Sequence, residues 1–359
     1  MIIIVGPFPP PVHGAALITQ RVTDRLAGEG FRLQLCNTAP GKVTARWRYH
    51  LRRIEAYLRC WRTILGPRSD SRRSNAVYVS LSGGFGLLYD FVVVALARLK
   101  RYNVVLHHHS FSYLARQSRI MRAITGIAGA DQLHIALCSK MATSISRQYG
   151  ANLRTVVVSN LAFLDLEESD RVLVGRELRT IGYLSNISRE KGIDRFLDMM
   201  AELRSRGSTL AGCIAGPFGD ADIEAYVKRR MDEIGGIDYV GPVFDDAKDR
   251  FLSSVDVLVF PTRYVHEAQP LVIFEAQAAG AIVSASDRGC IADMLSRELL
   301  LDSDATDLTK IVDQLLAWEG DSSVFSAALE EAGELRSKLR EQRQQDFVKF
   351  YDALERYKE

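Results

Sequence analysis

The chain has 359 residues, a length that suits two domains better than one. Its apolar fraction of 47% and charged fraction of 25% are those of an ordinary soluble globular protein. The net charge of +2 is too small to indicate a nucleic-acid partner, and we expect none.

The apolar start of the chain, residues 1–5, stops at Gly6 and Pro7. It has no basic leader and is too short for a signal peptide, so it predicts a buried first strand. The five cysteines are odd in number and scattered, which favours free thiols in a reducing cytoplasm. The apolar run at residues 91–96 is also far shorter than the roughly 20 residues that a bilayer-spanning helix needs.

Short β-branched runs alternate with helix-length amphipathic stretches along the chain. Because the runs are apolar throughout, they predict parallel strands buried on both faces of a sheet, and hence an α/β fold. The expected strands of the first half are residues 2–5, 33–36, 76–80, 104–107, 133–137 and 155–158. Those of the second half are residues 180–183, 210–215, 238–240, 257–260, 282–285 and 299–301.

An acidic segment that is low in glycine, residues 160–177, separates the halves and predicts a linker. We therefore predict two doubly wound, Rossmann-like domains that face each other across a cleft, at residues 1–165 and 175–340. A final helix, residues 342–359, carries an aromatic stripe and is expected to pack back on the first domain.

Ligands of such sheets bind beyond the carboxyl ends of the strands, so the loops there hold the candidate residues. Residues 6–16 form a loop of small residues before a helix, where backbone N–H groups can approach an anion. A proline-stiffened turn without a ligand explains this loop equally well. The GxGxxG fingerprint of dinucleotide-binding proteins is absent from this loop. The segment Gly84-Phe85-Gly86, after the third expected strand, lacks the third glycine, so a dehydrogenase is disfavoured.

The fourth expected strand ends in His107, His108 and His109. At most two of these side chains can share one face of a sheet. No Cys or carboxylate spacing elsewhere completes a metal site, so we expect no metal. One histidine at the end of the strand is a candidate for hydrogen bonding to a substrate, and the others are expected to be structural or solvated.

Two charged motifs follow in the second half. Arg189 and Lys191 precede an expected helix and predict a cradle for a diphosphate, with a solvated basic turn as the alternative. Glu267 precedes a helix that begins at Pro270, and Glu275 lies within it. The two acids would lie about 12 Å apart, too far for a glycosidase pair but suited to the two ends of a nucleotide sugar. Two acids on a surface helix are the alternative; at a buried site, Glu275 needs a hydroxyl or a cation as partner.

The spacing of Glu267 and Glu275 resembles the E-x7-E motif of the retaining GT-B glycosyltransferases of family four, also called glycosyltransferase group 1. Residues 188–192 resemble the phosphate-binding segment of that family, and residues 9–14 its N-terminal glycine loop. The strand that ends near His109 resembles the one that carries the family's active-site histidine. The resemblance spans nearly the whole chain and implies the GT-B architecture.

The resemblance also implies a role for each matching residue. Lys191 would contact the donor diphosphate and Glu275 the nucleotide ribose. Glu267 would bind the transferred sugar near its anomeric centre. The backbone of the segment after it would also help to bind the sugar. This segment consists of Gln269, Pro270, Leu271 and Val272.

In the first domain, His109 would hydrogen-bond the same sugar, and Gly14 would let that domain close on the phosphate. The family commonly has an arginine where this chain has Asn186, and we expect Arg189 to compensate. The implied reaction retains the anomeric configuration and needs neither a metal nor a cofactor, with the nucleotide diphosphate sugar as co-substrate.

A basic segment, residues 42–73, holds ten Lys or Arg against only Glu55 and Asp70. Aromatic side chains are interleaved, a pattern that suits the surface of an anionic bilayer. The residues expected to face a membrane are Arg46, Trp47, Arg48, Arg52, Arg53 and Trp61. The alternative is a solvated basic helix that covers the first domain.

These observations predict a retaining, hexosyltransferase-like enzyme that transfers a sugar to a glycan or lipid-linked acceptor in the synthesis of cell-envelope polysaccharide. It would be peripheral on the inner face of the cytoplasmic membrane. Two alternatives stay open: a non-catalytic partner protein that binds nucleotide sugars, and a sugar-nucleotide epimerase of the same fold.

Overall fold

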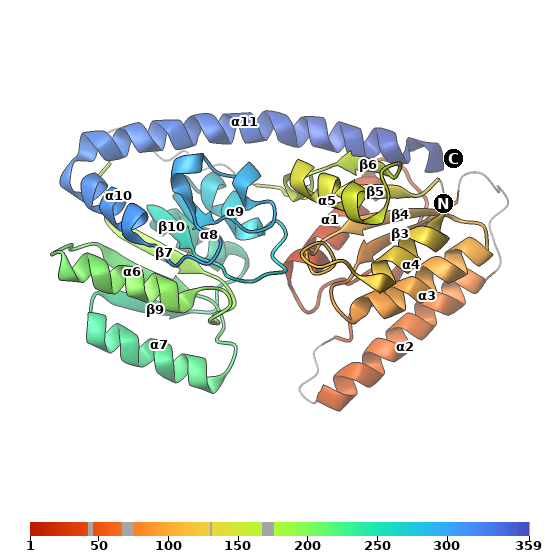
Figure 1. The fold of residues 1–359 in the computed structure, drawn as a ribbon, viewed down its shortest axis with the longest axis horizontal. Coiled ribbons are helices and arrows are strands. Elements are labelled where there is room, and N and C mark those ends of the chain that lie inside the picture. The colour runs from red at the N-terminus through yellow and green to blue at the C-terminus, as the bar shows by residue number, and fades with distance from the viewer. Residues whose placement is uncertain (42–45, 67–74, 130, 167–175, 359) are drawn as a thin grey trace. The chain divides into compact units, whose positions relative to one another are not determined.

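The computed structural model describes residues 1–41, 46–66, 75–129, 131–166 and 176–358 (Figure 1). The chain divides into two compact units. Unit 1 comprises Met1–Leu164 and Gln342–Glu359, and unit 2 comprises Asp165–Glu341. Each is built on a six-stranded sheet with helices, which confirms the predicted α/β class.

The sheet of unit 1 has the order β2-β1-β3-β4-β5-β6, and all of its pairings are parallel. Its strands are β1 (Ile2–Gly6), β2 (Leu33–Asn37), β3 (Ala76–Leu81), β4 (Asn103–His108), β5 (Leu133–Ala136) and β6 (Arg154–Val157). Every residue of β1 and β3 is buried, which explains why these strands are apolar throughout. The strand order reverses between β1 and β3, so the loops after these two strands border a crevice.

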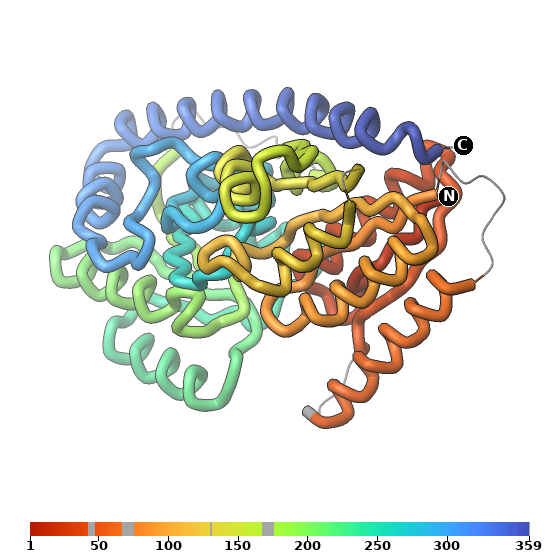
Figure 2. The backbone as a smooth tube through the Cα atoms, turned by 45° about the vertical axis from the view of Figure 1, so that its right-hand side comes forward, coloured from red at the N-terminus to blue at the C-terminus, as the bar shows by residue number. Residues whose placement is uncertain are grey.

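The helices of unit 1 are α1 (Gly14–Gly28), α2 (Arg46–Leu65), α3 (Gly86–Leu99), α4 (Arg119–Ala128) and α5 (Ser139–Tyr149). Helix α3 packs between α2 and α4 (Figure 1). The backbone trace shows α2 set at the margin of this group of helices (Figure 2).

The C-terminal segment of the chain packs within unit 1, where it completes the core. The ring of Phe350 meets that of Phe163 at 4.8 Å, and the ring of Tyr351 meets that of Phe31 at 5.9 Å. Phe163 lies in the 3-10 helix η1 (Asn160–Phe163), so the first part of the expected linker is buried structure. The rest of that linker, residues 167–175, lies outside the described residues.

The sheet of unit 2 has the order β12-β11-β10-β7-β8-β9 and is also parallel. Its strands are β7 (Thr180–Leu184), β8 (Ala211–Ala215), β9 (Ile237–Gly241), β10 (Val257–Phe260), β11 (Ile282–Ser286) and β12 (Leu300–Leu301). Each predicted strand of both units is present, with its ends shifted by at most one residue. The order reverses between β7 and β10, which is the switch point of this sheet.

The helices of unit 2 are α6 (Ile193–Ser205), α7 (Ala221–Ile234), α8 (Asp245–Ser254), α9 (Leu271–Ala278), α10 (Thr309–Gly320) and the first part of α11 (Ser322–Leu354). One core cluster joins the sheet to α6, α7, α10 and α11, through residues such as Phe196, Val227 and Trp318. Helices α8 and α9 pack against each other. None of the described helices combines the length and apolar character that crossing a membrane requires.

Candidate functional site

The switch point of unit 2 brings Lys191 and Glu267 together. Lys191 follows β7 and Glu267 follows β10, and these strands are neighbours in the sheet. The Nζ atom of Lys191 lies 2.6 Å from Oε2 of Glu267, and both side chains are mostly buried. The hydroxyl of Thr262 donates to the same carboxylate oxygen at 3.2 Å. The predicted cation and the first predicted acid therefore form one charged pair.

Aromatic rings surround the ammonium group of Lys191. Its Nζ atom lies 4.7 Å from the ring centre of Tyr264 and 5.8 Å from that of Phe260. A cation at these distances is attracted to the faces of the rings. Neither ring was identified as a site residue from the sequence, although Phe260 belongs to the predicted strand before the loop.

The loop of Lys191 depends on the glycine that follows it. Gly192 has φ of +83°, and a Cβ atom there would lie 1.9 Å from the carbonyl oxygen of Pro261. Only glycine allows this approach, so the loop after β7 can pack directly on the end of β10. The carbonyl oxygen of Lys191 accepts a hydrogen bond from Tyr183 at 3.1 Å, which fixes the backbone further.

The loop of Glu267 is supported by a second glycine. Gly289 has φ of +56°, and a Cβ atom there would lie 2.3 Å from the carbonyl oxygen of Glu267. The N–H of Cys290 donates to the carbonyl oxygen of Ala268 at 2.8 Å. The segment after β11 therefore holds the backbone that carries the acid.

Glu275 has the cationic partner that its burial requires. The Nζ atom of Lys248, on α8, lies 2.6 Å from Oε1 of Glu275, on α9. Helix α9 begins at Leu271, one residue later than expected, and its N-cap Pro270 makes no side-chain cap. Gln269 is buried beside it, and Leu271 and Val272 are the half-buried first residues of the helix.

The other predicted cation, Arg189, has different neighbours. Its guanidinium lies 4.1 Å from the ring centre of Tyr226 and 4.0 Å from a carboxylate oxygen of Asp194. Arg263 also pairs with Asp194, at 2.8 Å. Asn186 is exposed. The contacts of Arg189 therefore lie with Tyr226 and Asp194, and not with the pair formed by Lys191 and Glu267.

The three consecutive histidines at the end of β4 point to alternate sides of the sheet. His107 and His109 share one side of β4, with ring centres 4.0 Å apart. Burial lowers the pKa of His109 to about 3, with His13 as a further cause, so its ring is neutral at pH 7. Among the described residues nothing hydrogen-bonds its buried Nε2 atom. His13 caps α1, because its Nδ1 atom accepts from the N–H of Ala16 at 3.3 Å, and exposed Gly14 begins that helix.

His108 points the other way, into a buried hydrogen-bond network. Its Nδ1 atom lies 3.0 Å from the hydroxyl of Tyr113, and its Nε2 atom lies 2.9 Å from Nδ1 of His134. Nε2 of His134 meets Oε1 of Gln132 at 2.9 Å. The amide of Gln132 donates to two carbonyl oxygens, which leaves its own oxygen as an acceptor and so fixes both histidine tautomers. His108 is therefore structural.

Among the residues that the structure describes, no three His, Cys, Asp or Glu side chains converge as a metal site would require.

Helix α2 carries the residues that were expected to face a membrane. Trp47, Arg48 and Arg52 are exposed, whereas the side chain of Arg46 lies outside the described residues. Arg53 and Trp61 are half-buried. Arg53 lies 5.5 Å from the ring centre of Tyr89, and the buried Nε1 of Trp61 has no hydrogen-bond partner in the described part of the chain.

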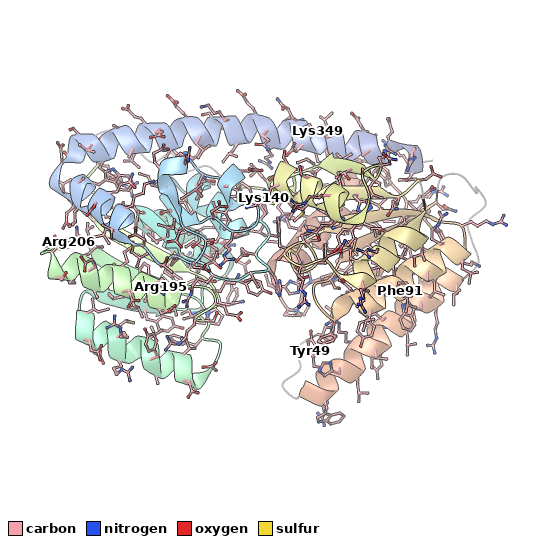
Figure 3. All side chains as sticks on the ribbon, in the orientation of Figure 1. Tyr49, Phe91, Lys140, Arg195, Arg206 and Lys349 are labelled. Atoms are coloured by element: carbon pink, nitrogen blue, oxygen red, sulfur yellow. The ribbon has the colours of Figure 1, made fainter. Side chains whose placement is uncertain are left out.

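The exposed side of α2 carries an apolar stripe instead. The stripe consists of Trp47, Leu51, Ile54, Leu58 and Leu65, which are 39–61% exposed. Its spacing repeats along one helical face, and the exposed Arg48, Arg52, Arg59 and Arg62 lie along one side of it. The first turns of α2 project beyond α3 (Figures 1 and 2), and Tyr49 lies near that end (Figure 3).

Comparison with known proteins agrees with this architecture. Residues 178–318 match the family model described as glycosyl transferases group 1. Alr3699/HepE from Anabaena, in complex with UDP and glucose, superposes with a TM-score of 0.70 at 14% identity over 99% of each chain. Sucrose-phosphate synthase (tll1590) from Thermosynechococcus elongatus gives the same TM-score, identity and coverage.

WaaG, a glycosyltransferase involved in lipopolysaccharide biosynthesis, has a TM-score of 0.62 at 13% identity, over 94% of this chain and 95% of its own. No curated protein sequence matches the chain. At these identities the likeness shows the fold, which is GT-B.

Proposed function

We propose that the protein is a retaining, metal-independent glycosyltransferase that transfers a hexose from a nucleotide diphosphate sugar. The observation that carries the proposal is the pair of Lys191 and Glu267 at the switch point of unit 2, where sheets of this kind bind their ligands. The match of residues 178–318 to a glycosyltransferase family model supports it.

In this proposal the charged pair changes partners when the donor binds. Lys191 turns from Glu267 to the diphosphate and stabilises the charge that grows on it as the glycosidic bond breaks. The N-terminus of α9, which begins at Leu271, adds backbone N–H groups for the same charge. Glu267 then accepts hydrogen bonds from hydroxyls of the transferred sugar, and Glu275 accepts them from the ribose.

The stereochemistry follows from a reaction on one face of the sugar. The acceptor hydroxyl attacks the anomeric carbon from the side that the diphosphate leaves, and the departing phosphate oxygen takes the proton of that hydroxyl. No enzyme carboxylate forms a covalent intermediate. His109, neutral because its pKa is about 3, donates one hydrogen bond to the sugar and adds no charge.

The donor is proposed to be a UDP-sugar. The described complexes of the similar Alr3699/HepE contain UDP, UDP with glucose, and UDP-glucose. These structures share the fold of this chain at 13–14% identity, so they supply a candidate nucleotide to test first.

The acceptor is proposed to be a lipid-linked glycan precursor of cell-envelope polysaccharide, reached at the inner face of the cytoplasmic membrane. The exposed stripe of α2 supports this, since it presents apolar side chains beside a row of exposed arginines. Each cation near an anionic bilayer surface contributes about 1 kcal/mol of attraction. A similar structure, WaaG, acts in lipopolysaccharide biosynthesis.

Release of nucleoside diphosphate tests the proposal. The purified protein is incubated with UDP-, GDP- and ADP-sugars and a membrane lipid extract. We expect release from one donor, and its loss in Glu267→Ala and Lys191→Ala. Lys228→Ala is the matched control, because Lys228 forms an exposed pair with Glu224 on α7.

One observation favours a second function. Asn186 is exposed and Arg189 contacts Tyr226, so the donor site has fewer cations than the resemblance implies. A nucleotide-sugar-binding partner without activity would bind a donor tightly and release nothing. An epimerase would convert the donor without any acceptor, so the same assay separates the three functions.

A further inference from the structure

We propose that Lys248 is a positioning residue that orients Glu275 toward the two hydroxyls of a ribose, so that the site selects ribonucleotides over deoxyribonucleotides. The inference rests on the proposed function, because it assigns a selectivity to the nucleotide end of the same site. Lys248 had no role in the sequence analysis.

The contact joins two different helices. Lys248 lies in the second turn of α8, and Glu275 lies in the second turn of α9. Their Nζ and Oε1 atoms are 2.6 Å apart, and the side chains are 26% and 12% exposed. A carboxylate that is this buried needs a partner, and an ammonium group at hydrogen-bond distance supplies one.

The pair leaves one side of the carboxylate available. In the described part of the chain, the hydrogen bond to Glu275 goes to Oε1 alone, and Oε2 is not among the buried atoms that lack a partner. An ionised carboxylate only accepts hydrogen bonds. Oε2 can therefore accept from neutral hydroxyl donors, and the vicinal hydroxyls of a ribose supply two.

The proposed site contains two similar pairs of a lysine and a glutamate. Lys191 from the loop after β7 holds Glu267, and Lys248 from α8 holds Glu275. The two pairs involve four elements of unit 2, so they fix two separate carboxylates. In the proposed site the first pair faces the diphosphate and the sugar, which leaves the second pair for the nucleoside.

Orientation is what Lys248 contributes. Without the ammonium group, Glu275 is free to adopt other rotamers, and its oxygen is no longer held toward the ribose. A site that is built to pair with a hydroxyl rejects an analogue that lacks it, because a buried polar group is then left unpaired. The preference for ribose should therefore disappear with Lys248, even if some nucleotide binding persists.

Calorimetric titration tests the inference. The probe is whichever of UDP, GDP and ADP binds the wild-type protein most tightly, together with its 2′-deoxy and 3′-deoxy forms. We expect the wild type to prefer the ribonucleotide over at least one deoxy form by about tenfold or more. Lys248→Met should reduce that ratio to less than about twofold, whereas Lys248→Arg should retain most of it.

The control is Lys228→Met. Lys228 and Glu224 form a pair with the same 2.6 Å distance, but on the exposed side of α7, with side chains 59% and 42% exposed. This variant should leave the ratio unchanged. Thermal unfolding of each variant shows whether it is folded, and Glu275→Gln should lose the preference in the same way as Lys248→Met.

Two results separate the inference from the proposed function. If no nucleoside diphosphate binds the wild type, the proposed donor site is wrong and the inference falls with it. If the nucleotide binds but the folded Lys248→Met variant keeps the full preference for ribose, the role of Lys248 is overturned and the donor site stands.

Discussion

The Nζ atom of Lys191 lies 2.6 Å from Oε2 of Glu267, although 76 residues separate the two in the chain. The contact exists because β7 and β10 are neighbours at the point where the strand order reverses. In the absence of a ligand each residue neutralises the other. The pair therefore has a structural and a chemical role, and a double variant can separate them.

Lys191→Met should lower turnover by about 10²–10³-fold, the usual cost of removing one group that stabilises the leaving charge. It should also lower the free energy of unfolding by about 1–3 kcal/mol, because the mostly buried Glu267 loses its cation and keeps only the hydrogen bond from Thr262. Lys191→Met combined with Glu267→Gln should recover most of the stability and none of the turnover. Urea unfolding and release of nucleoside diphosphate measure the two effects; a double variant as unstable as the single one would contradict a structural role.

Gly192→Ala should destabilise unit 2 and abolish donor binding. The new Cβ atom would lie 1.9 Å from the carbonyl oxygen of Pro261, so the loop of Lys191 must move. Gly207→Ala is a matched control, because Gly207 has the same φ of +83° and nothing within 4 Å of the added atom. The control should lose only about 1–2 kcal/mol, the cost of a left-handed backbone at an ordinary residue. Equal losses of stability in the two variants would show that the approach to Pro261 is unimportant.

The α/β class, the strands and the positions of both acids could be predicted from the sequence, because buried parallel strands leave a continuous apolar signal. The partners of these side chains could not be predicted. Lys248 and Lys228 each lie on a polar helix near an acid, and only the packing of α8 on α9 makes one pair buried and the other exposed. Alternation along β4 separated His108 from its neighbours, but its partner His134 lies on another strand. The half-burial of Arg53 and Trp61 could not be predicted either, because composition does not say which side of α2 faces α3.

Acid should destabilise unit 1 below about pH 6.5, the ordinary pKa of histidine. Burial holds the pKa of His107 and His108 well below that value, that of His109 at about 3 and that of His134 at about 4. Between those values and pH 6.5 the unfolded chain binds protons that the folded chain does not, so stability rises with pH and falls on acidification. At pH 5.5 each of the four histidines removes about 1.4 kcal/mol.

Urea unfolding at pH 7.5 and pH 5.5 measures this effect. The background variant is Trp318→Phe, because the remaining tryptophans, Trp47 and Trp61, both lie in unit 1 and report on it alone. His134→Gln should reduce the loss of unfolding free energy on acidification by about 1.4 kcal/mol, the contribution of one histidine. His50→Gln, at an exposed position on α2, should leave that loss unchanged. Stability that is equal at the two pH values would rule out buried neutral histidines.

The stripe of α2 should bind anionic vesicles. In flotation with vesicles that contain phosphatidylglycerol, we expect the protein to float, less so at high salt, and to stay at the bottom with phosphatidylcholine alone. Reversing two cations with Arg48→Glu and Arg52→Glu should weaken binding by about 30-fold or more. Arg229→Glu, at an exposed position of unit 2, should have little effect. Binding that is indifferent to lipid charge would contradict the role of the arginines.

Asn186→Arg should strengthen donor binding. Asn186 is exposed in the loop between β7 and α6, so a longer side chain meets no packed core, and Arg189 is already engaged with Tyr226. A guanidinium in this loop adds a charge-assisted hydrogen bond to the diphosphate, which should lower the Kd by about tenfold and make binding more sensitive to salt. Asn152→Arg adds the same charge at an exposed position of unit 1 and serves as the control. An equal gain in both variants would indicate a general effect of net charge, whereas a gain in Asn186→Arg alone, with faster release of nucleoside diphosphate, would mean that the missing cation limits this chain.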